Sequence, residues 1–429
     1  MIYRPPAVIT LLILLLAAVL FLTEKLPVAV TALLTAMLLY ITGVIDARVA
    51  FSGFTNNVVI LITGMFVIGA SLFETGVAKR IGSLITRFAK TEKQLLLAIM
   101  LITASLSAFL SNTSTTAVMM PIVIVIAASA GYSNSKFLMP LAYASAFGGM
   151  ITLVGTNGNL AVQGIMENQG IEGFGFFEFV YVGVPLTLVG IVYMMTIGHR
   201  LIPDRKGEQD IVVDGQSKEE EDNNPNHTLF KQVISVGVLF FAVIFMVFES
   251  KIGIPLHIVS VIGALIIVVS GTMSEKQAFK SLDLSTIILV AAMMPMATAL
   301  DETGAAVMIA NFVLGMIGES GGPYVITAVI FVVTALLTSI MSNTAAAALM
   351  APIGLVLAVS LGADPKAVLM TVCIAANAAY ASPVGSPPNT MIYGPGNYKF
   401  IDYIKNGIPI LVIQLILCVF VVPLIWPFY

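Results

Sequence analysis

Charged residues are scarce in this chain. Only 10% of its 429 residues are Asp, Glu, Lys or Arg, whereas 58% are hydrophobic and the mean hydropathy is +1.01. Soluble globular domains carry about 25% charged residues, so the composition excludes that class and indicates an integral membrane protein. The net charge of −3 is small, and no nucleic acid is expected among the partners.

Cysteine and catalytic motifs are scarce too. Cys373 and Cys418 lie inside apolar runs, and two such residues support neither a disulfide framework nor a metal site. The sequence contains no HExxH motif, no paired aspartates within apolar runs and no serine beside a lysine or histidine base at its polar motifs. We therefore do not expect an enzyme.

Long apolar runs dominate what is present. Each is long enough, or nearly so, to cross roughly 30 Å of hydrocarbon as a helix. The runs cover 7–23, 27–45, 57–73, 178–198, 229–248, 255–271, 285–300 and 408–426. The first run has a counterpart at 229–248, so we interpret it as a span and not as a cleaved signal. The sequence predicts an all-α polytopic membrane protein.

Three unlike motifs occur twice at nearly one separation. They are Ser111-Asn112-Thr113 with Ser342-Asn343-Thr344 at an offset of 231 residues, Glu74-Thr75-Gly76 with Glu302-Thr303-Gly304 at 228, and Gly155 to Asn159 with Gly385 to Asn389 at 230. A common register indicates two homologous halves, about 7–203 and 228–429. The acidic segment 201–228 between them is interpreted as a linker, with a docking tail as the alternative.

Each Ser-Asn-Thr motif separates two apolar stretches, within 95–131 and 326–361. We interpret both segments as re-entrant hairpins, with two ordinary spans joined by a turn as the alternative. Irregular backbone inside a bilayer is tolerated where it lines a protein cavity and side chains satisfy it, and Ser, Asn and Thr supply the groups required. No ionisable residue lies within 94–135 or 324–363, so the tips carry no protein charge.

The Gly-rich motifs interrupt two further apolar helices, predicted at 137–165 and 366–394. Glycine and proline free backbone carbonyls from helical pairing. Corresponding interruptions in two halves indicate a transporter binding site, because half-helix N-termini attract anions and free carbonyls bind cations.

The predicted topology follows from these segments. A hairpin leaves each half with five crossings, one of them the broken helix, and an odd number makes the halves inverted repeats. Placing the linker in the cytoplasm puts sixteen of the 20 Lys and Arg residues inside and four outside, as the positive-inside rule favours. We therefore predict a cell (inner) membrane protein with a cytoplasmic linker and external termini.

The negative charge of an anion bound at the hairpin tips must be compensated. An anion there needs helix dipoles, hydroxyl and amide donors, or bound cations. Ser107 and Thr338 lie one helical turn before Ser111 and Ser342, so each tip has a second oxygen on the same face. Such hard oxygen ligands suit Na⁺, whereas a hydroxyl bonded to its own preceding turn is the alternative interpretation.

Paired Ser-Asn-Thr tips, each followed by a Gly-Thr/Ser-x-x-Asn break, resemble the divalent anion/sodium symporter family of the ion transporter superfamily. The resemblance covers nearly the whole chain. It implies Na⁺-coupled transport of small divalent anions, such as succinate, malate or citrate, by a homodimer in which a transport domain moves against a scaffold as an elevator. The scaffold would comprise 7–93 and 229–322, and the transport domain 94–200 and 323–429.

The same resemblance implies residue roles. One Na⁺ would be held by Ser107, Ser111, Asn112 and Gly155, and the other by Thr338, Ser342, Asn343 and Gly385. Substrate contacts would come from Asn112, Thr113, Thr156, Asn343, Thr344, Ser386 and Pro387. Against the family pattern we expect ten spans instead of eleven, without an extra first helix, and the first break contains no proline.

Several alternatives stay open within this superfamily. They are an Na⁺-independent dicarboxylate exchanger, a sulfate transporter, an arsenite permease and a sodium/proton antiporter. Proton exchange normally needs a titratable residue in the membrane interior, and the two breaks contain none.

Overall fold

The computed structural model describes residues 6–23, 25–77, 91–205, 228–248, 252–305, 307–309 and 322–428. Every regular element within these residues is helical, in agreement with the predicted all-α class. Seven helical stretches are long and apolar enough to cross a membrane, by length and composition, and shorter apolar helices accompany them.

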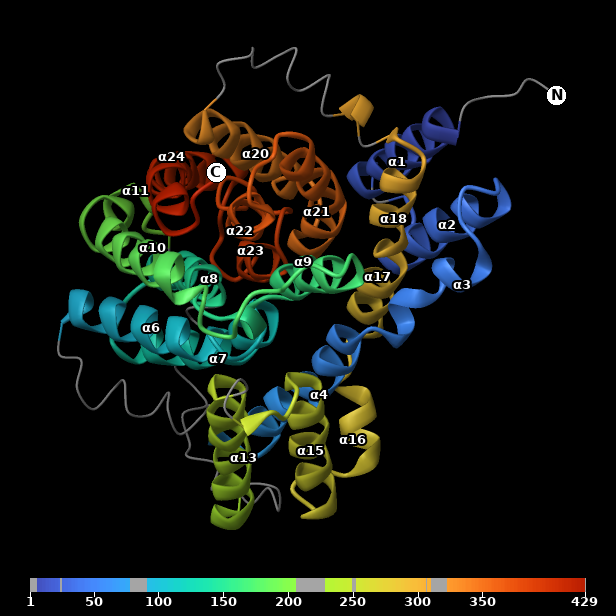
Figure 1. Ribbon diagram of the computed structural model, residues 1–429. Coiled ribbons are helices and arrows are strands. Elements are labelled where there is room, and N and C mark those ends of the chain that lie inside the picture. The colour runs from blue at the N-terminus through green and yellow to red at the C-terminus, as the bar shows by residue number, and fades with distance from the viewer. Residues whose placement is uncertain are drawn as a thin grey trace.

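One group of helices comes from the beginning of each half. It comprises α1 (Pro6–Thr23), α2 (Val28–Ile41), α3 (Ala47–Ala50), η1 (Ser52–Thr55), α4 (Asn57–Glu74), α13 (Leu229–Val247), α15 (Leu256–Val269), α16 (Glu275–Lys280), α17 (Leu284–Met293) and α18 (Pro295–Glu302). Within it α4 packs on α15 and α2 on α17, along the right and lower sides of Figure 1. Glycine permits one close approach, since a Cβ on Gly64 would lie 2.6 Å from the carbonyl carbon of Ser260.

Two helical hairpins carry the Ser-Asn-Thr motifs. The first pairs α6 (Glu92–Ser107) with α7 (Asn112–Ser129), and the second pairs α20 (Pro323–Thr338) with α21 (Asn343–Ser360). The serine of each motif caps the second helix: Ser111 Oγ accepts from Ser114 N at 3.2 Å, and Ser342 Oγ accepts from Ala345 N at 3.3 Å. The segments 95–131 and 326–361 are thus helix–turn–helix units, and their position in the bilayer stays a prediction.

An interrupted helix follows each hairpin. The first consists of α8 (Ser135–Gly149), the short turn η2 (Leu153–Gly155) and α9 (Asn157–Asn168), and the second of α22 (Pro365–Ala376) and α23 (Pro387–Tyr393). Both interruptions fall within the predicted 137–165 and 366–394. They begin several residues earlier than the Gly-rich motifs, because α8 ends at Gly149 and α22 at Ala376.

The last asparagine of each motif donates hydrogen bonds to carbonyls at the break. Asn159 Nδ2 donates to the carbonyls of Gly149 and Thr152 at 3.3 and 3.1 Å. These carbonyls belong to the end of α8 and the irregular segment after it, where intrahelical partners are missing. In the second half Asn389 Nδ2 donates to carbonyls ten and seven residues before it, at 2.7 and 2.9 Å. The two breaks therefore have the same internal hydrogen bonding.

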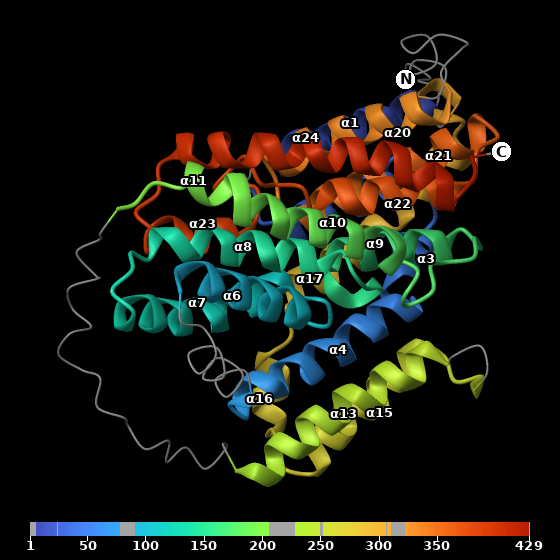
Figure 2. The same ribbon diagram turned by 90° about the vertical axis from the view of Figure 1, so that its left-hand side faces the viewer.

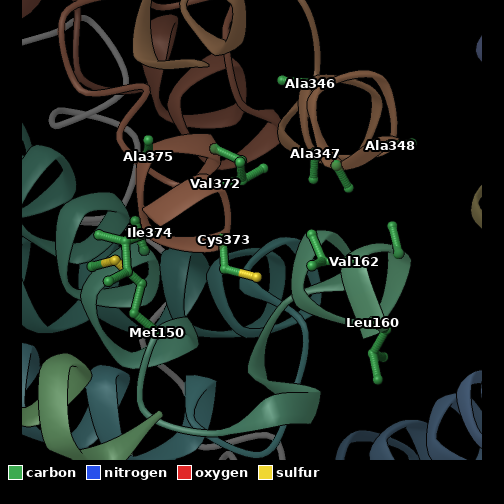
Figure 3. Close-up of a cluster of buried hydrophobic side chains, with 14 of the residues drawn as sticks. Met150, Leu160, Val162, Ala346, Ala347, Ala348, Val372, Cys373, Ile374 and Ala375 are labelled. Atoms are coloured by element: carbon green, nitrogen blue, oxygen red, sulfur yellow. The ribbon is translucent and has the colours of Figure 1, made fainter. Parts of the chain in front are cut away.

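The second part of each broken helix packs on the other half of the chain. α9 packs on α21 and α22, and α23 packs on α7 and α8. Figure 3 shows the alanines of α21 beside α9, where Ala347 and Val162 lie in one apolar cluster with Cys373 of α22. Small residues allow this approach, and a Cβ on Gly158 would lie 3.3 Å from Ala347 Cβ. The halves therefore share one interior.

Two long helices, α10 and α24, complete the group that contains the hairpins and the interrupted helices. α10 (Val180–Tyr193) continues through the π-helical turn η3 (Met194–Gly198) into α11 (His199–Leu201), and it packs on α8 and on α24 (Phe400–Ile425). α11, after which the linker begins, and the C-terminal end of α24 lie at opposite ends of the molecule in Figure 2.

Some predictions fall outside the described residues. The structure leaves out 206–227, which holds most of the linker 201–228, and it also leaves out 78–90. The division into scaffold and transport domains also stays a prediction, as do the cytoplasmic linker and the external termini.

Candidate functional site

A cavity of about 210 Å³ lies where the two hairpin tips meet. We call it the tip cavity. It brings together Asn112 and Thr113 of the first half with Asn343, Thr344 and Pro387 of the second, all predicted substrate contacts. The full lining is Val28, Ser111, Asn112, Thr113, Asn157, Gly158, Asp283, Ser285, Thr286, Leu289, Ser342, Asn343, Thr344, Pro387 and Pro388.

Helix N-termini converge on this cavity. α7, α9, α17 and α21 all begin at or next to residues that line it. A helix N-terminus carries a partial positive charge and unpaired N–H groups, which favour a negative ligand. Among the lining residues that the structure describes none is basic, and Asp283 is the only ionisable one. The local positive potential therefore comes from backbone.

The remaining two predicted substrate contacts lie just behind the lining. Thr156 is buried, and its Oγ1 caps α9 by accepting from Asn159 N at 3.2 Å. Ser386 is buried at the N-cap position of α23. Each directly precedes a lining residue, so both are adjacent to the cavity and not part of its described wall.

The predicted second cation set forms a cluster of oxygen atoms. Thr338 Oγ1 donates to the carbonyl of Ala376 at 2.6 Å. The Asn343 amide atom that faces this region lies 2.9 Å from Thr338 Oγ1, 3.2 Å from Ala376 O and 3.1 Å from Gly385 O. We call these groups the second oxygen cluster. Hydroxyl, amide and backbone oxygens are the ligands that hard cations take, so this donor set fits Na⁺. Ser342 Oγ also caps α21 by accepting from Ala345 N.

The first half contains the matching arrangement. Ser107 Oγ bonds to Asn112 Oδ1 at 2.9 Å and to Ser145 O at 2.7 Å, across the same sequence separations as in the second half. Ser107 and Thr338 thus bond to the following interrupted helix, and not to their own preceding turn as the alternative interpretation held. The backbone of Gly155 lies close to the end of α8, since a Cβ on Gly155 would be 2.5 Å from Gly149 O.

Several residues near the cavity were not among the predicted site residues. Asp283 caps α17 by accepting from Thr286 N at 3.1 Å, and Asn157 Nδ2 donates to Thr286 Oγ1 at 3.4 Å. Asn377 accompanies the second oxygen cluster, 3.4 Å from Asn343. Asp283, Thr286 and Asn377 belong to no repeated motif, so the duplication gave no signal for them. Asn157 does lie within the motif Gly155 to Asn159, at the position equivalent to Pro387, but it was not among the predicted site residues.

A second cavity, of about 190 Å³, adjoins the first. Ser111 and Asn157 line both. Its other wall comes mainly from apolar side chains of α4, including Ile62, Met65 and Phe66. The tip cavity therefore lies next to the interface between the first hairpin and α4.

Comparison with known proteins places the chain among transporters. A family model described as "Citrate transporter" matches residues 18–355 and 243–428. The uncharacterized transporter YfbS of Escherichia coli is 26% identical over 96% of this chain and 98% of that protein. The sodium-dependent dicarboxylate transporter SdcS of Staphylococcus saprophyticus is 27% identical over 95% of this chain and 84% of that protein.

Two solved structures share the fold. The YdaH transporter of Alcanivorax borkumensis has a TM-score of 0.62 at 13% sequence identity and covers 98% of both chains. MtrF of Neisseria gonorrhoeae, described as illuminating a class of antimetabolite efflux pumps, has a TM-score of 0.61 at 14% identity and covers 98% of this chain and 95% of its own. This likeness confirms an all-helical membrane protein with several spans.

Proposed function

The chain belongs to the citrate transporter family and is related to sodium-dependent dicarboxylate transporters, as its motifs predicted, and we propose that it carries small di- or tricarboxylates across the membrane together with Na⁺. Membership of this family makes it a secondary transporter and not an enzyme. Succinate, malate and citrate are the substrates we expect.

The tip cavity is the observation that carries this proposal. Polar tips from both halves and several helix N-termini meet there, and no described lining residue is basic. Such a site attracts carboxylates through backbone N–H groups, serine and threonine hydroxyls, and asparagine amides. In this proposal Asn112, Thr113, Thr156, Asn343, Thr344, Ser386 and Pro387 bind the substrate.

Sodium supplies the missing positive charge. Removing a carboxylate from water costs several kcal/mol, whereas a helix N-terminus contributes ~0.3 to 2 kcal/mol. The oxygen clusters beside the tips offer two places for a cation within reach of the same asparagines that line the cavity. We assign the first Na⁺ to Ser107, Ser111, Asn112 and Gly155 and the second to Thr338, Ser342, Asn343 and Gly385.

An elevator motion agrees with the packing. The hairpins and broken helices of the two halves pack on each other through α9 on α21 and α23 on α7, which supports their movement as one body. We propose that 94–200 and 323–429 form the moving body, that 7–93 and 229–322 form the scaffold, and that the protein is a homodimer. The linker 201–228 would face the cytoplasm and both termini the outside of the cell membrane.

Uptake into proteoliposomes tests the proposed function. Purified protein is reconstituted, and uptake of labelled succinate, citrate and sulfate is measured with an inward Na⁺ gradient and with choline in its place. We expect carboxylate uptake that requires Na⁺. Uptake that is equal in choline and depends on an anion inside the vesicles would identify an exchanger, and uptake of sulfate alone would overturn the substrate class.

A further inference from the structure

Asn377 is a buried amide that stands beside the second oxygen cluster without a counterpart in the first half. It follows directly after α22, and its side chain is 1% exposed. The offset of 231 residues that relates Thr338 to Ser107 and Ala376 to Ser145 places Ala146 at the equivalent position. The two halves therefore differ here by one amide group.

Three hydrogen bonds fix the orientation of the Asn377 amide. Its Nδ2 donates to Cys373 O at 2.8 Å and to Thr156 Oγ1 at 3.3 Å, and its Oδ1 accepts from Asn343 Nδ2 at 3.4 Å. A carbonyl oxygen such as that of Cys373 can only accept, so the Nδ2 of Asn377 must point to it. The Oδ1 of Asn377 is consequently directed at Asn343.

This orientation constrains the Asn343 amide, which has two possible directions. With Nδ2 toward the second oxygen cluster, it donates to Thr338 Oγ1, Ala376 O and Gly385 O at 2.9 to 3.2 Å, and no cation is needed. Its Oδ1 then faces the Oδ1 of Asn377, which places two acceptors together. With Oδ1 toward the cluster, Asn343 donates to Asn377, but its oxygen lies among other oxygens. In this second direction Asn343 Oδ1 also accepts from Thr338 Oγ1 at 2.9 Å, and a cation between the oxygens would stabilise it further.

We propose that Asn377 is a positioning residue that holds Asn343 in its cation-binding orientation and links the second cation site to Thr156 beside the tip cavity. This inference rests on the Na⁺ coupling proposed above. Asn377 bonds both to a residue of the oxygen cluster and to the cap of α9 from the other half. Because Ala146 has no amide, the first cation site lacks this link, so the two sites are not equivalent.

Substitution of Asn377 by alanine tests the role, because it installs the residue that the first half already carries. We expect Asn377→Ala to raise the Na⁺ concentration for half-maximal anion binding about fivefold, the effect of one lost hydrogen bond of average strength. The maximal uptake rate at saturating Na⁺ should stay within about twofold of wild type. A general packing defect would lower the maximal rate and leave the Na⁺ dependence unchanged.

Two further variants make the test specific. Thr371→Val is the matched control, because Thr371 is also buried on α22 and its hydroxyl bonds to Ala367 O of its own helix. Its Na⁺ dependence should equal that of wild type. Asn377→Ser keeps a hydroxyl that can bond to the preceding turn but is too short to reach Asn343. It should show the Na⁺ shift expected of the alanine variant, and it provides the test if the alanine variant fails to fold.

The outcomes separate this inference from the proposed function. Na⁺-dependent binding in wild type with a raised Na⁺ requirement in Asn377→Ala and Asn377→Ser supports both. Na⁺-dependent binding in wild type with an unchanged requirement in either variant overturns the role of Asn377 alone. Binding that is independent of Na⁺ in wild type overturns both.

Discussion

Arg205 and Asp402 form a bidentate ion pair although they lie 197 positions apart, with Nη1–Oδ2 and Nη2–Oδ1 distances of 2.7 and 3.3 Å. Arg205 follows α11 near the beginning of the linker 201–228, and Asp402 lies in the first turn of α24. Arg205 Nη1 also donates to Asn397 O at 2.8 Å. The pair therefore ties the beginning of the linker 201–228 to the second part of the proposed moving body.

Loss of this pair should destabilise the protein. Asp402 is 5% exposed, so Arg205→Ala leaves a buried carboxylate without its charged partner, and we expect a loss of about 1–3 kcal/mol in the free energy of unfolding. In a double-mutant cycle monitored by thermal unfolding, Arg205→Ala combined with Asp402→Asn should cost less than the two single losses added together. Additive losses would show that the two residues act independently.

The asparagines of the tips should be indispensable for transport. Asn112→Ala and Asn343→Ala each remove an amide that lines the tip cavity and bonds to an oxygen cluster. We expect uptake to be lost while expression and membrane insertion remain. Asn168→Ala is the control, because Asn168 is the last residue of α9, outside the tip cavity lining. Near-normal uptake by either tip variant would move the site elsewhere.

Gly149 should tolerate no side chain. A Cβ there would lie 2.2 Å from Asn112 Oδ1 and 2.5 Å from Thr156 Cγ2, so Gly149→Ala forces two predicted site residues to move. Such overpacking costs about 1–3 kcal/mol, and we expect anion affinity to fall at least about tenfold. Gly237→Ala on α13 is the matched control, because a Cβ there meets nothing within 4 Å. Equal affinities of the two variants would contradict the assigned geometry.

The carboxylate of Asp283 should repel a bound anion and lower its affinity, because it is the one negative side chain among the described lining residues. Asn caps helices about as well as Asp, so Asp283→Asn removes the charge and keeps the cap of α17. We expect tighter dianion binding at subsaturating Na⁺, by about three- to tenfold, and a weaker dependence on ionic strength. Asp301→Asn, away from the lining, should leave affinity unchanged. Weaker binding by Asp283→Asn would mean that Asp283 helps to hold a cation.

The repeat made part of this architecture predictable from the sequence. Ser107 and Thr338 could be found because each lies one turn before a duplicated motif, and helix geometry then fixes their relation to Asn112 and Asn343. The apolar runs predicted as spans also coincide with helices, because their lengths and compositions allow few other structures in a bilayer.

Other residues could not be found in this way. Asn377 corresponds to Ala146, so comparison of the halves hides it, and its role depends on contacts with Asn343 and Thr156 that only the folded chain creates. Asp283 reaches the tip cavity through the packing of α17 on α9 and α21, which no local pattern encodes. The breaks begin before their glycine motifs because Asn159 and Asn389 bond backward to earlier carbonyls.

Equilibrium binding of the dianion at varied Na⁺ shows whether Na⁺ binding and anion binding are coupled in this protein. Binding of succinate or citrate to purified protein is measured by titration calorimetry at fixed ionic strength, with choline or K⁺ replacing Na⁺. Thermodynamic linkage requires Na⁺ to tighten anion binding and the anion to tighten Na⁺ binding by one common factor. The account predicts affinity that rises with Na⁺ and is not restored by choline or K⁺. Equal affinity in Na⁺ and in choline would contradict it.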